Sequence, residues 1–281
     1  MILLKVNFWT RVLDCTVIVL INISVIVMGI WLSIIPIAKN KNYYVNRYEE
    51  NEVAIKIIER TYPGVDIDDA IDKIAQVNID YFFGNLEEYQ VEINGIKLFN
   101  EYEVRHMKDV KDLFVVGQTL AVIFLMILIA CFFYVCRYFR RLRKVVVNTT
   151  LCFYGAIIIL LILFVIWSYN TYMTDEYKEY NTFFTYAFIN FHKIIFFYDH
   201  DKYLLATSQG EYEGVLWTMT RFMNSEFFME IGITIAIVVV LFILLWIGII
   251  ITYYCLYPKI CKKVDEVHER AKEFSQVEHT T

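Results

Sequence analysis

The stretch LFVVGQTLAVIFLMILIACFFYVCRYFRRLRK, residues 113–144, joins twenty-four uncharged residues to an eight-residue link with five basic side chains. A helix needs about 20 consecutive apolar residues to cross the roughly 30 Å of hydrocarbon in a bilayer. The stretch therefore predicts a transmembrane helix at 113–136, followed by a basic connection at 137–144.

Three more uncharged stretches lie outward from this one, at residues 15–38, 145–174 and 231–258. A soluble core rarely needs four such runs in 281 residues, so we expect membrane spans at about 15–38, 113–136, 145–168 and 230–254. The first run is too long for a signal-peptide core, and no small-residue cleavage site follows it, so we expect it to remain as a span. The prediction is an all-α membrane protein.

Basic residues close to the spans set the predicted orientation. The link 137–144 is basic, and Lys259, Lys262 and Lys263 follow the last span, whereas residues 39–112 hold sixteen acidic against ten basic side chains. Because short basic connections stay inside, we expect both termini and the tail 259–281 in the cytoplasm, and the loops 39–112 and 169–229 outside. The net charge of −5 is then an external acidic surplus, which gives no sign of nucleic-acid binding.

The cysteines predict neither an external disulfide nor a metal site. All six lie in spans or near their cytoplasmic ends, which argues against four-span families whose outer loops are cross-linked by disulfides, such as tetraspanins and claudins. No Cys or His pair has structural zinc spacing, and we expect no metal or other cofactor. Asp199-His200-Asp201 looks suited to a metal ion, but adjacent residues rarely converge on one ion.

Local signals predict a small α/β cap outside the membrane, formed by the two loops. Asp66 can begin a helix, and residues 91–98 alternate about Asn94-Gly95, the dipeptide best suited to a type I′ hairpin turn. Asn100 and Glu103 fit a capping box, from which a helix can run unbroken into the second span.

The expected cap and loops place two histidines near the outer membrane boundary. His106 precedes Leu113 by seven residues, or about 10 Å of helix, which is the depth of lipid headgroups and esters. Around it, Arg105 with Asp109 and Lys108 with Asp112 could pair, although a solvated helix face explains these charges as well. His192 lies in the apolar, aromatic segment 183–197, which is too short for a fifth span and typical of the interface.

Three stretches resemble one family. Residues 99–114, FNEYEVRHMKDVKDLF, resemble the E-x-x-H-M-x-D-V region of the bacterial lipoprotein intramolecular transacylase (Lit) family. Residues 188–197, FINFHKIIFF, are similar to its second motif, and Glu226-Phe227-Phe228 is similar to the E-F-F before its final span. The chain departs from the family in its somewhat longer outer loops and in the missing proline after the second motif.

The resemblance implies an acyltransferase of the Gram-positive cell envelope that acts on diacylglyceryl-modified lipoproteins in contact with membrane lipids. It would move the sn-2 acyl chain to the α-amine of the N-terminal cysteine and leave an N-acylated lyso-form. The family's catalytic residues correspond to His106 and His192. Side chains expected to orient the substrate or the histidines are Asp109, Glu226, Met107 and Phe191.

The residues themselves suit this chemistry, because imidazole can accept or donate a proton near pH 7. The sequence has neither a G-x-S-x-G elbow nor an external cysteine that could form an acyl-enzyme. Other readings are a non-enzymatic four-span scaffold or transporter subunit, or an acyltransferase for another lipid or a second molecule. Spans without acidic or basic residues, and no visible inverted repeat, speak against a transporter.

Overall fold

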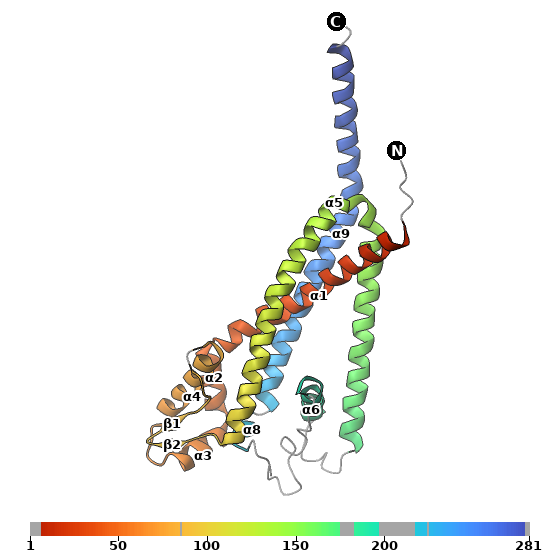
Figure 1. Ribbon diagram of the computed structural model, residues 1–281. Helices are drawn as coiled ribbons and strands as arrows, with labels where there is room; N and C mark the ends of the chain where they lie inside the picture. The colour runs from red at the N-terminus through yellow and green to blue at the C-terminus, as the bar shows by residue number, and fades with distance from the viewer. Residues whose placement is uncertain (1–6, 85, 175–182, 197–216, 224, 279–281) are drawn as a thin grey trace.

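The computed structural model describes residues 7–84, 86–174, 183–196, 217–223 and 225–278. Its long helices are α1 (Phe8–Ala38), α5 (Glu101–Thr174) and α9 (Ser225–Glu278). Helix α5 contains two apolar segments, on either side of a non-helical residue, Tyr138. Within the described ranges, four helical segments are long and apolar enough to cross a membrane: Phe8–Ala38, Glu101–Tyr138, Val145–Thr174 and Phe227–Leu256. The predicted all-α protein with four spans is confirmed (Figure 1).

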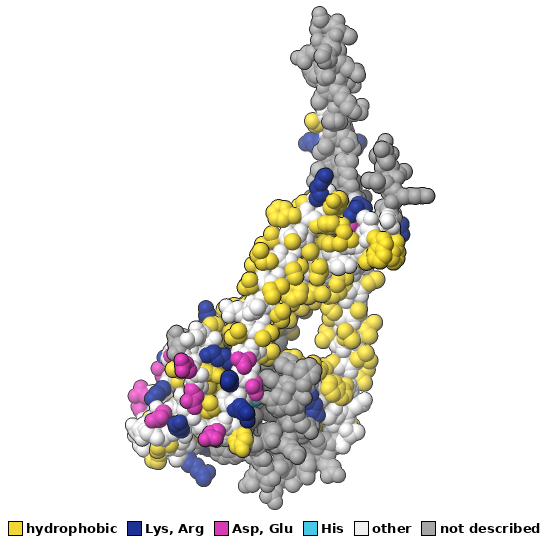
Figure 2. All heavy atoms as spheres, in the orientation of Figure 1, with side chains coloured by type: hydrophobic (Ala, Val, Ile, Leu, Met, Phe, Trp, Pro, Cys, Tyr) yellow, Lys and Arg dark blue, Asp and Glu magenta, His cyan; other side chains and the backbone are white. Residues whose placement is uncertain are grey.

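The surface of these helices is apolar, as lipid contact requires. Met126, Leu160 and Leu245, on three different spans, are each 64% exposed. Figure 2 shows hydrophobic side chains covering the helices, charged side chains of both signs gathered on the cap at one end, and basic side chains at the opposite end. In water so large an apolar surface would be unfavourable by about 25 cal/mol per Å². Burial in a bilayer removes that cost.

Two polar clusters tie the spans together. Asn22 of α1 donates to Thr150 Oγ1 of α5 (3.2 Å), and Trp246 of α9 donates to Asn22 Oδ1 (2.9 Å). Near the basic link, Arg141 forms a two-pronged ion pair with the buried Asp14, at 2.7 and 2.9 Å. These contacts fix how α1 crosses the two segments of α5.

The cap consists mainly of helices from the first outer loop: α2 (Lys41–Glu50), α3 (Glu52–Thr61) and α4 (Ile67–Phe82). Helix α4 and its Asp66 cap were predicted and are confirmed, since Asp66 Oδ1 accepts the N–H groups of Asp68 and Asp69. Helices α2 and α3 were not predicted. Their signals were the N-cap residues Asn40 and Asn51, whose side chains accept hydrogen bonds from the first turns.

The predicted hairpin forms, but its strands are short. Strand β1 (Glu92–Ile93) pairs antiparallel with β2 (Ile96–Lys97), with Ile93 opposite Ile96. Asn94 and Gly95 take φ values of 54° and 80°, as a type I′ turn needs. With two residues in each strand, the expected α/β cap is largely helical.

A hydrogen-bonded tyrosine network fills the cap core. The Tyr89 hydroxyl donates to Asn78 Oδ1 at 2.8 Å, and Asn78 Nδ2 donates to the Tyr48 hydroxyl at 2.9 Å. All three side chains are 0% exposed. Burial raises the pKa of Tyr89 well above its ordinary value, so that hydroxyl remains protonated and able to donate. The network makes the cap a rigid support for the start of α5.

The second outer loop contributes α6 (Phe183–Phe196) and α8 (Trp217–Phe222). Helix α6 coincides with the predicted interfacial aromatic segment. The Asp199-His200-Asp201 stretch lies outside the described residues. Helix α9 continues through the basic Lys259–Lys263 region, so the tail is helical as far as Glu278.

Candidate active site

The first motif begins α5 with a reciprocal cap. Asn100 Oδ1 accepts hydrogen bonds from the N–H groups of Tyr102 (2.9 Å) and Glu103 (3.0 Å), while Glu103 Oε2 accepts one from the Asn100 N–H (2.9 Å). The predicted capping box is confirmed. It fixes the first turn of α5 and hence the position of His106, one turn later.

Glu103 also contacts a second helix, which local sequence patterns did not predict. Its Oε1 accepts a hydrogen bond from the N–H of Met219, in the first turn of α8, at 2.8 Å. The carboxylate is 0% exposed, and burial of this kind is tolerated only where the oxygens are hydrogen-bonded. Glu103 therefore joins the starts of α5 and α8, helices that are far apart in the sequence.

His106 and Met107 occupy different environments on this turn of α5. His106 is partly exposed, whereas Met107 is buried in the cap core. Met107 thus anchors the turn to the cap by packing, and His106 lies beside this anchored face. The expectation that Met107 orients the substrate or a histidine stays a prediction.

Two ion pairs that the sequence suggested beside His106 do not form along the helix. Within the described part of the chain, Arg105 forms no ion pair with Asp109, and Lys108 forms none with Asp112. Arg105 and Lys108 are exposed, so the solvated-face interpretation holds for both.

The third motif inserts into the cap. Phe227 is 4% exposed, and its ring lies 5.5 Å from that of Tyr43. The Tyr43 hydroxyl donates to the Phe227 carbonyl at 3.2 Å; burial and, secondly, the charge of Glu230 raise the pKa of Tyr43 to about 12, so it remains a donor. Arg47 of α2 pairs with Glu230 at 3.0 Å. The side chain of Glu226 lies outside the described residues.

The second motif is carried by α6, which packs between the third and fourth spans. Asn190 is buried and donates to Ser168 Oγ (3.3 Å) and Thr171 Oγ1 (3.4 Å) at the outer end of α5. On another face, the Phe188 ring stacks on that of Phe228 at 4.7 Å. Phe191 is 51% exposed.

The side chain of His192 lies outside the described residues, and so does its expected meeting with His106. Its backbone belongs to α6, four residues after Phe188, and residues at that spacing share a helix face.

The structure thus brings together the elements that carry the three motifs. Glu103 bonds the start of α5 to α8, Phe227 packs into the cap, and Phe228 contacts α6. All three motifs are visible in the sequence, but these contacts were not predicted, since they join residues separated by more than a hundred positions or by a loop. In Figure 1 these elements lie at the same end of the spans.

Among the described residues, no group of three His, Cys, Asp or Glu side chains is arranged to hold a metal ion. The five cysteines described, Cys15, Cys131, Cys136, Cys152 and Cys255, are free thiols.

A family model described as lipoprotein intramolecular transacylase Lit matches residues 19–211 of the chain. The matched range contains the first and second motifs with both histidines, and the Glu226-Phe227-Phe228 motif follows it. No curated protein sequence and no solved structure matches this chain.

Proposed function

Because this chain belongs to the lipoprotein intramolecular transacylase (Lit) family, we propose that it moves the sn-2 acyl chain of a diacylglyceryl-cysteine lipoprotein to the α-amine of the same cysteine. The product is an N-acylated lyso-form lipoprotein. At the family level the chain is a multi-pass membrane transacylase; the donor position and the acceptor are the proposal.

The observation that carries the proposal is the connection of the three motifs at one end of the bundle. The Glu103–Met219 hydrogen bond and the Phe188–Phe228 stack link α5, α6, α8 and α9 there. An intramolecular transfer needs its amine, ester and proton carriers held together, and such positioning can contribute about 7–11 kcal/mol to lowering a barrier. A rigid cap joined to α6 through α9 supplies the frame for that positioning.

The reaction requires one bond to form and one to break. The cysteine nitrogen attacks the ester carbonyl carbon and forms an amide, and the bond from that carbon to the sn-2 glycerol oxygen breaks. The nitrogen loses a proton, and the glycerol oxygen gains one and leaves as a hydroxyl. Two imidazoles can carry these protons, each accelerating the reaction by about 10²–10⁴-fold.

We assign the base role to His106 and the acid role to His192. Asp109, three residues after His106 on α5, lies on an adjacent part of the helix face, where a carboxylate favours a protonated imidazole. Glu226 would orient one of the histidines. Phe191, exposed on α6, would contact the acyl chain, and Met107 holds the turn that carries His106.

Charge distribution supports an active site at the outer leaflet, with both termini in the cytoplasm. The link 137–144 and the start of the tail are basic, whereas the cap loop carries sixteen acidic against ten basic side chains. A lipoprotein held at the outer surface by its lipid chains would present its cysteine at the depth of His106.

The test is mass spectrometry of lipoprotein N-termini from bacteria that lack their own N-acylating enzyme and express this chain. Transacylation leaves the total mass unchanged, so fragment ions must show the acyl group on nitrogen and a monoacylglyceryl group on sulfur. If every lipoprotein keeps a diacylglyceryl group and a free amine while the protein accumulates in the membrane, the proposal is wrong.

A further inference from the structure

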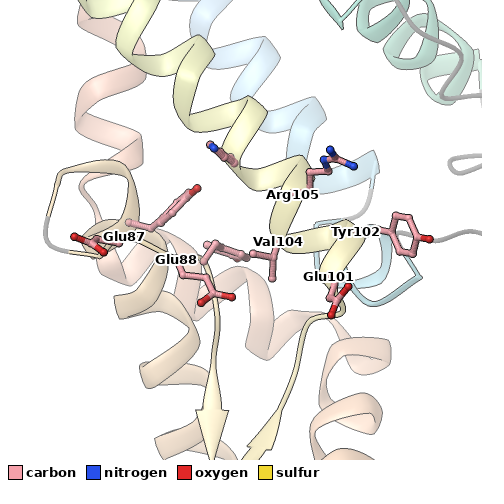
Figure 3. A pocket seen from close by; sticks show the side chains of 9 residues that line it. Glu87, Glu88, Glu101, Tyr102, Val104 and Arg105 are labelled. Atoms are coloured by element: carbon pink, nitrogen blue, oxygen red, sulfur yellow. The ribbon is translucent and has the colours of Figure 1, made fainter.

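A pocket of about 570 Å³ lies on the cap beside the turn of α5 that carries His106 (Figure 3). One wall is the segment after α4, with Glu87 and Glu88, and the other is the first two turns of α5, from Glu101 to Lys108. The buried rings of Tyr81 and Tyr89 belong to its lining. The hydrogen bond from Tyr89 to Asn78 holds this part of the pocket in place.

The charged side chains of this pocket are not used within the fold. In the part of the chain that the structure describes, its five charged side chains form no ion pair and no side-chain hydrogen bond; they are Glu87, Glu88, Glu101, Arg105 and Lys108. All five are exposed. The charges are therefore available to a polar ligand.

The charged residues that α5 contributes to the pocket lie at different distances from the membrane. At 1.5 Å per residue, Lys108 lies about 8 Å outside the apolar run that begins at Leu113, and Glu101 lies about 18 Å outside it. The cations of α5 are thus nearer the membrane, and its acidic residue is farther out. His106, at about 10 Å, lies level with the inner part of the pocket.

Resting on the proposed function, we propose that this pocket binds the polypeptide that directly follows the lipid-modified cysteine, and that it prefers basic side chains there. The cysteine must lie near His106 while its lipid stays in the bilayer, so the chain after it has to extend outward. An extended chain spans about 3.3–3.6 Å per residue, so the distance from His106 to Glu101 takes two or three residues.

The excess of carboxylates in the pocket lining is the reason to expect a preference for basic side chains in the substrate. The lining carries three carboxylates and two cations, and Glu101 lies at the outer end, where the third or fourth residue of the substrate would reach it. A zwitterionic lipid headgroup is the rival ligand, but it would sit at ester depth, whereas the pocket extends about 8 Å farther out along α5. The outward extent favours a peptide.

The test compares three synthetic diacylglyceryl-cysteine peptides whose third and fourth residues are both lysine, both serine or both glutamate. Their binding to the full-length protein in nanodiscs is measured with fluorescent labels, and the N-acyl product is measured in parallel. The variant is Glu87→Gln with Glu88→Gln and Glu101→Gln. The control, Glu49→Gln with Glu59→Gln and Glu92→Gln, removes the same charge from exposed positions elsewhere on the cap.

We expect the unaltered protein and the control to bind the lysine peptide about three- to tenfold more tightly than the glutamate peptide, as a few exposed ion pairs allow. In the pocket variant this ratio should fall close to one. The proposal is wrong if the unaltered protein binds the lysine and glutamate peptides equally, or if the pocket variant keeps the same affinity ratio. It is also wrong if the ratio changes with the lipid headgroup of the nanodisc and not with the peptide. Absence of N-acyl product with a retained ratio would instead refute only the transacylation.

Discussion

At the scale of single residues, Glu103 connects the first motif to the second half of the chain. One oxygen caps α5 through the Asn100 N–H, and the other accepts the Met219 N–H of α8. The bond to Asn100 could be predicted, because a capping box is a local pattern of two residues three positions apart. The bond to Met219 could not, since it joins positions 116 apart and depends on the folded cap.

Glu103→Gln should destabilise the protein and lower its activity while leaving both histidines in place. The amide nitrogen of glutamine cannot accept a hydrogen bond, so one buried N–H loses its partner, at a cost of about 1–3 kcal/mol. Thermal unfolding in detergent measures the loss, with Glu49→Gln, on the exposed cap surface, as the control. An unchanged unfolding midpoint would show that the bonds to Glu103 do not hold the two helices together.

Replacing either proposed catalytic histidine should remove N-acylation without removing the protein from the membrane. His106→Ala and His192→Ala are each expected to lower the rate by about 10²–10⁴-fold. His268→Ala, in the tail, serves as the matched control. If either alanine variant keeps more than about a tenth of the activity, the loss is smaller than general acid–base catalysis predicts and that histidine has been assigned wrongly.

The rate should also depend on pH through the imidazole base. A base acts only when unprotonated, and the ordinary imidazole pKa is about 6.5, so the N-acylation rate should fall as the pH drops below that region. The substrate amine, with an ordinary pKa of about 7.7–8.0, strengthens the same trend. This pH dependence is measured from initial rates between pH 5 and about 8. A rate that does not change with pH would mean that neither the imidazole nor the substrate amine has to lose a proton before the rate-limiting step.

At the scale of elements, the sequence predicted what depends on local pattern. The α4 helix, the Asn94-Gly95 turn and the continuous helix from Glu101 all follow from caps, turn residues and periodicity. Helices α2 and α3 were missed, although Asn40 and Asn51 cap them. The α2 sequence is tyrosine-rich and lacks the regular apolar spacing of α4, whereas α3 has such spacing at Ala54, Ile57 and Ile58, a signal that could have predicted it. The contact of α6 with α9 had no local signal at all.

The Phe188–Phe228 stack should couple α6 to α9 energetically. A double-mutant cycle with Phe188→Ala and Phe228→Ala is expected to give a coupling of about 0.5–1.5 kcal/mol, and each single change should lower N-acylation. Phe183→Ala, in the first turn of α6, combined with Phe228→Ala is the control cycle. Equal coupling in the two cycles would mean that the observed stack does not position the second motif.

At the scale of the whole molecule, apolar spans and a charged cap divide the chain into a membrane part and an aqueous part (Figure 2). This division was predictable, because it depends on composition summed over long stretches. The start of α1 and the end of α9 lie at the end opposite the cap (Figure 1). The approach of the motif-bearing helices was not predictable, since it depends on packing between distant segments.

Labelling of introduced cysteines should give the orientation directly. Glu59→Cys, exposed on α3, is expected to react with a membrane-impermeant maleimide in intact cells, and His268→Cys in the tail only after the cells are permeabilised. The unaltered protein, with its six native cysteines, gives the background. The reverse pattern would place the cap in the cytoplasm, away from lipoproteins at the outer leaflet.

An isotope-crossing measurement tests the central claim, transfer within one substrate molecule. Purified protein is given an equal mixture of two lipopeptides, one with a deuterated sn-2 acyl chain and an ordinary peptide, the other with an ordinary acyl chain and a ¹⁵N-labelled peptide. Fragment spectra of the N-acylated products should show deuterated acyl groups only on ordinary peptides and ordinary acyl groups only on ¹⁵N peptides. Exchange of labels between the two, or N-acylation that consumes bilayer phospholipid, would contradict the account.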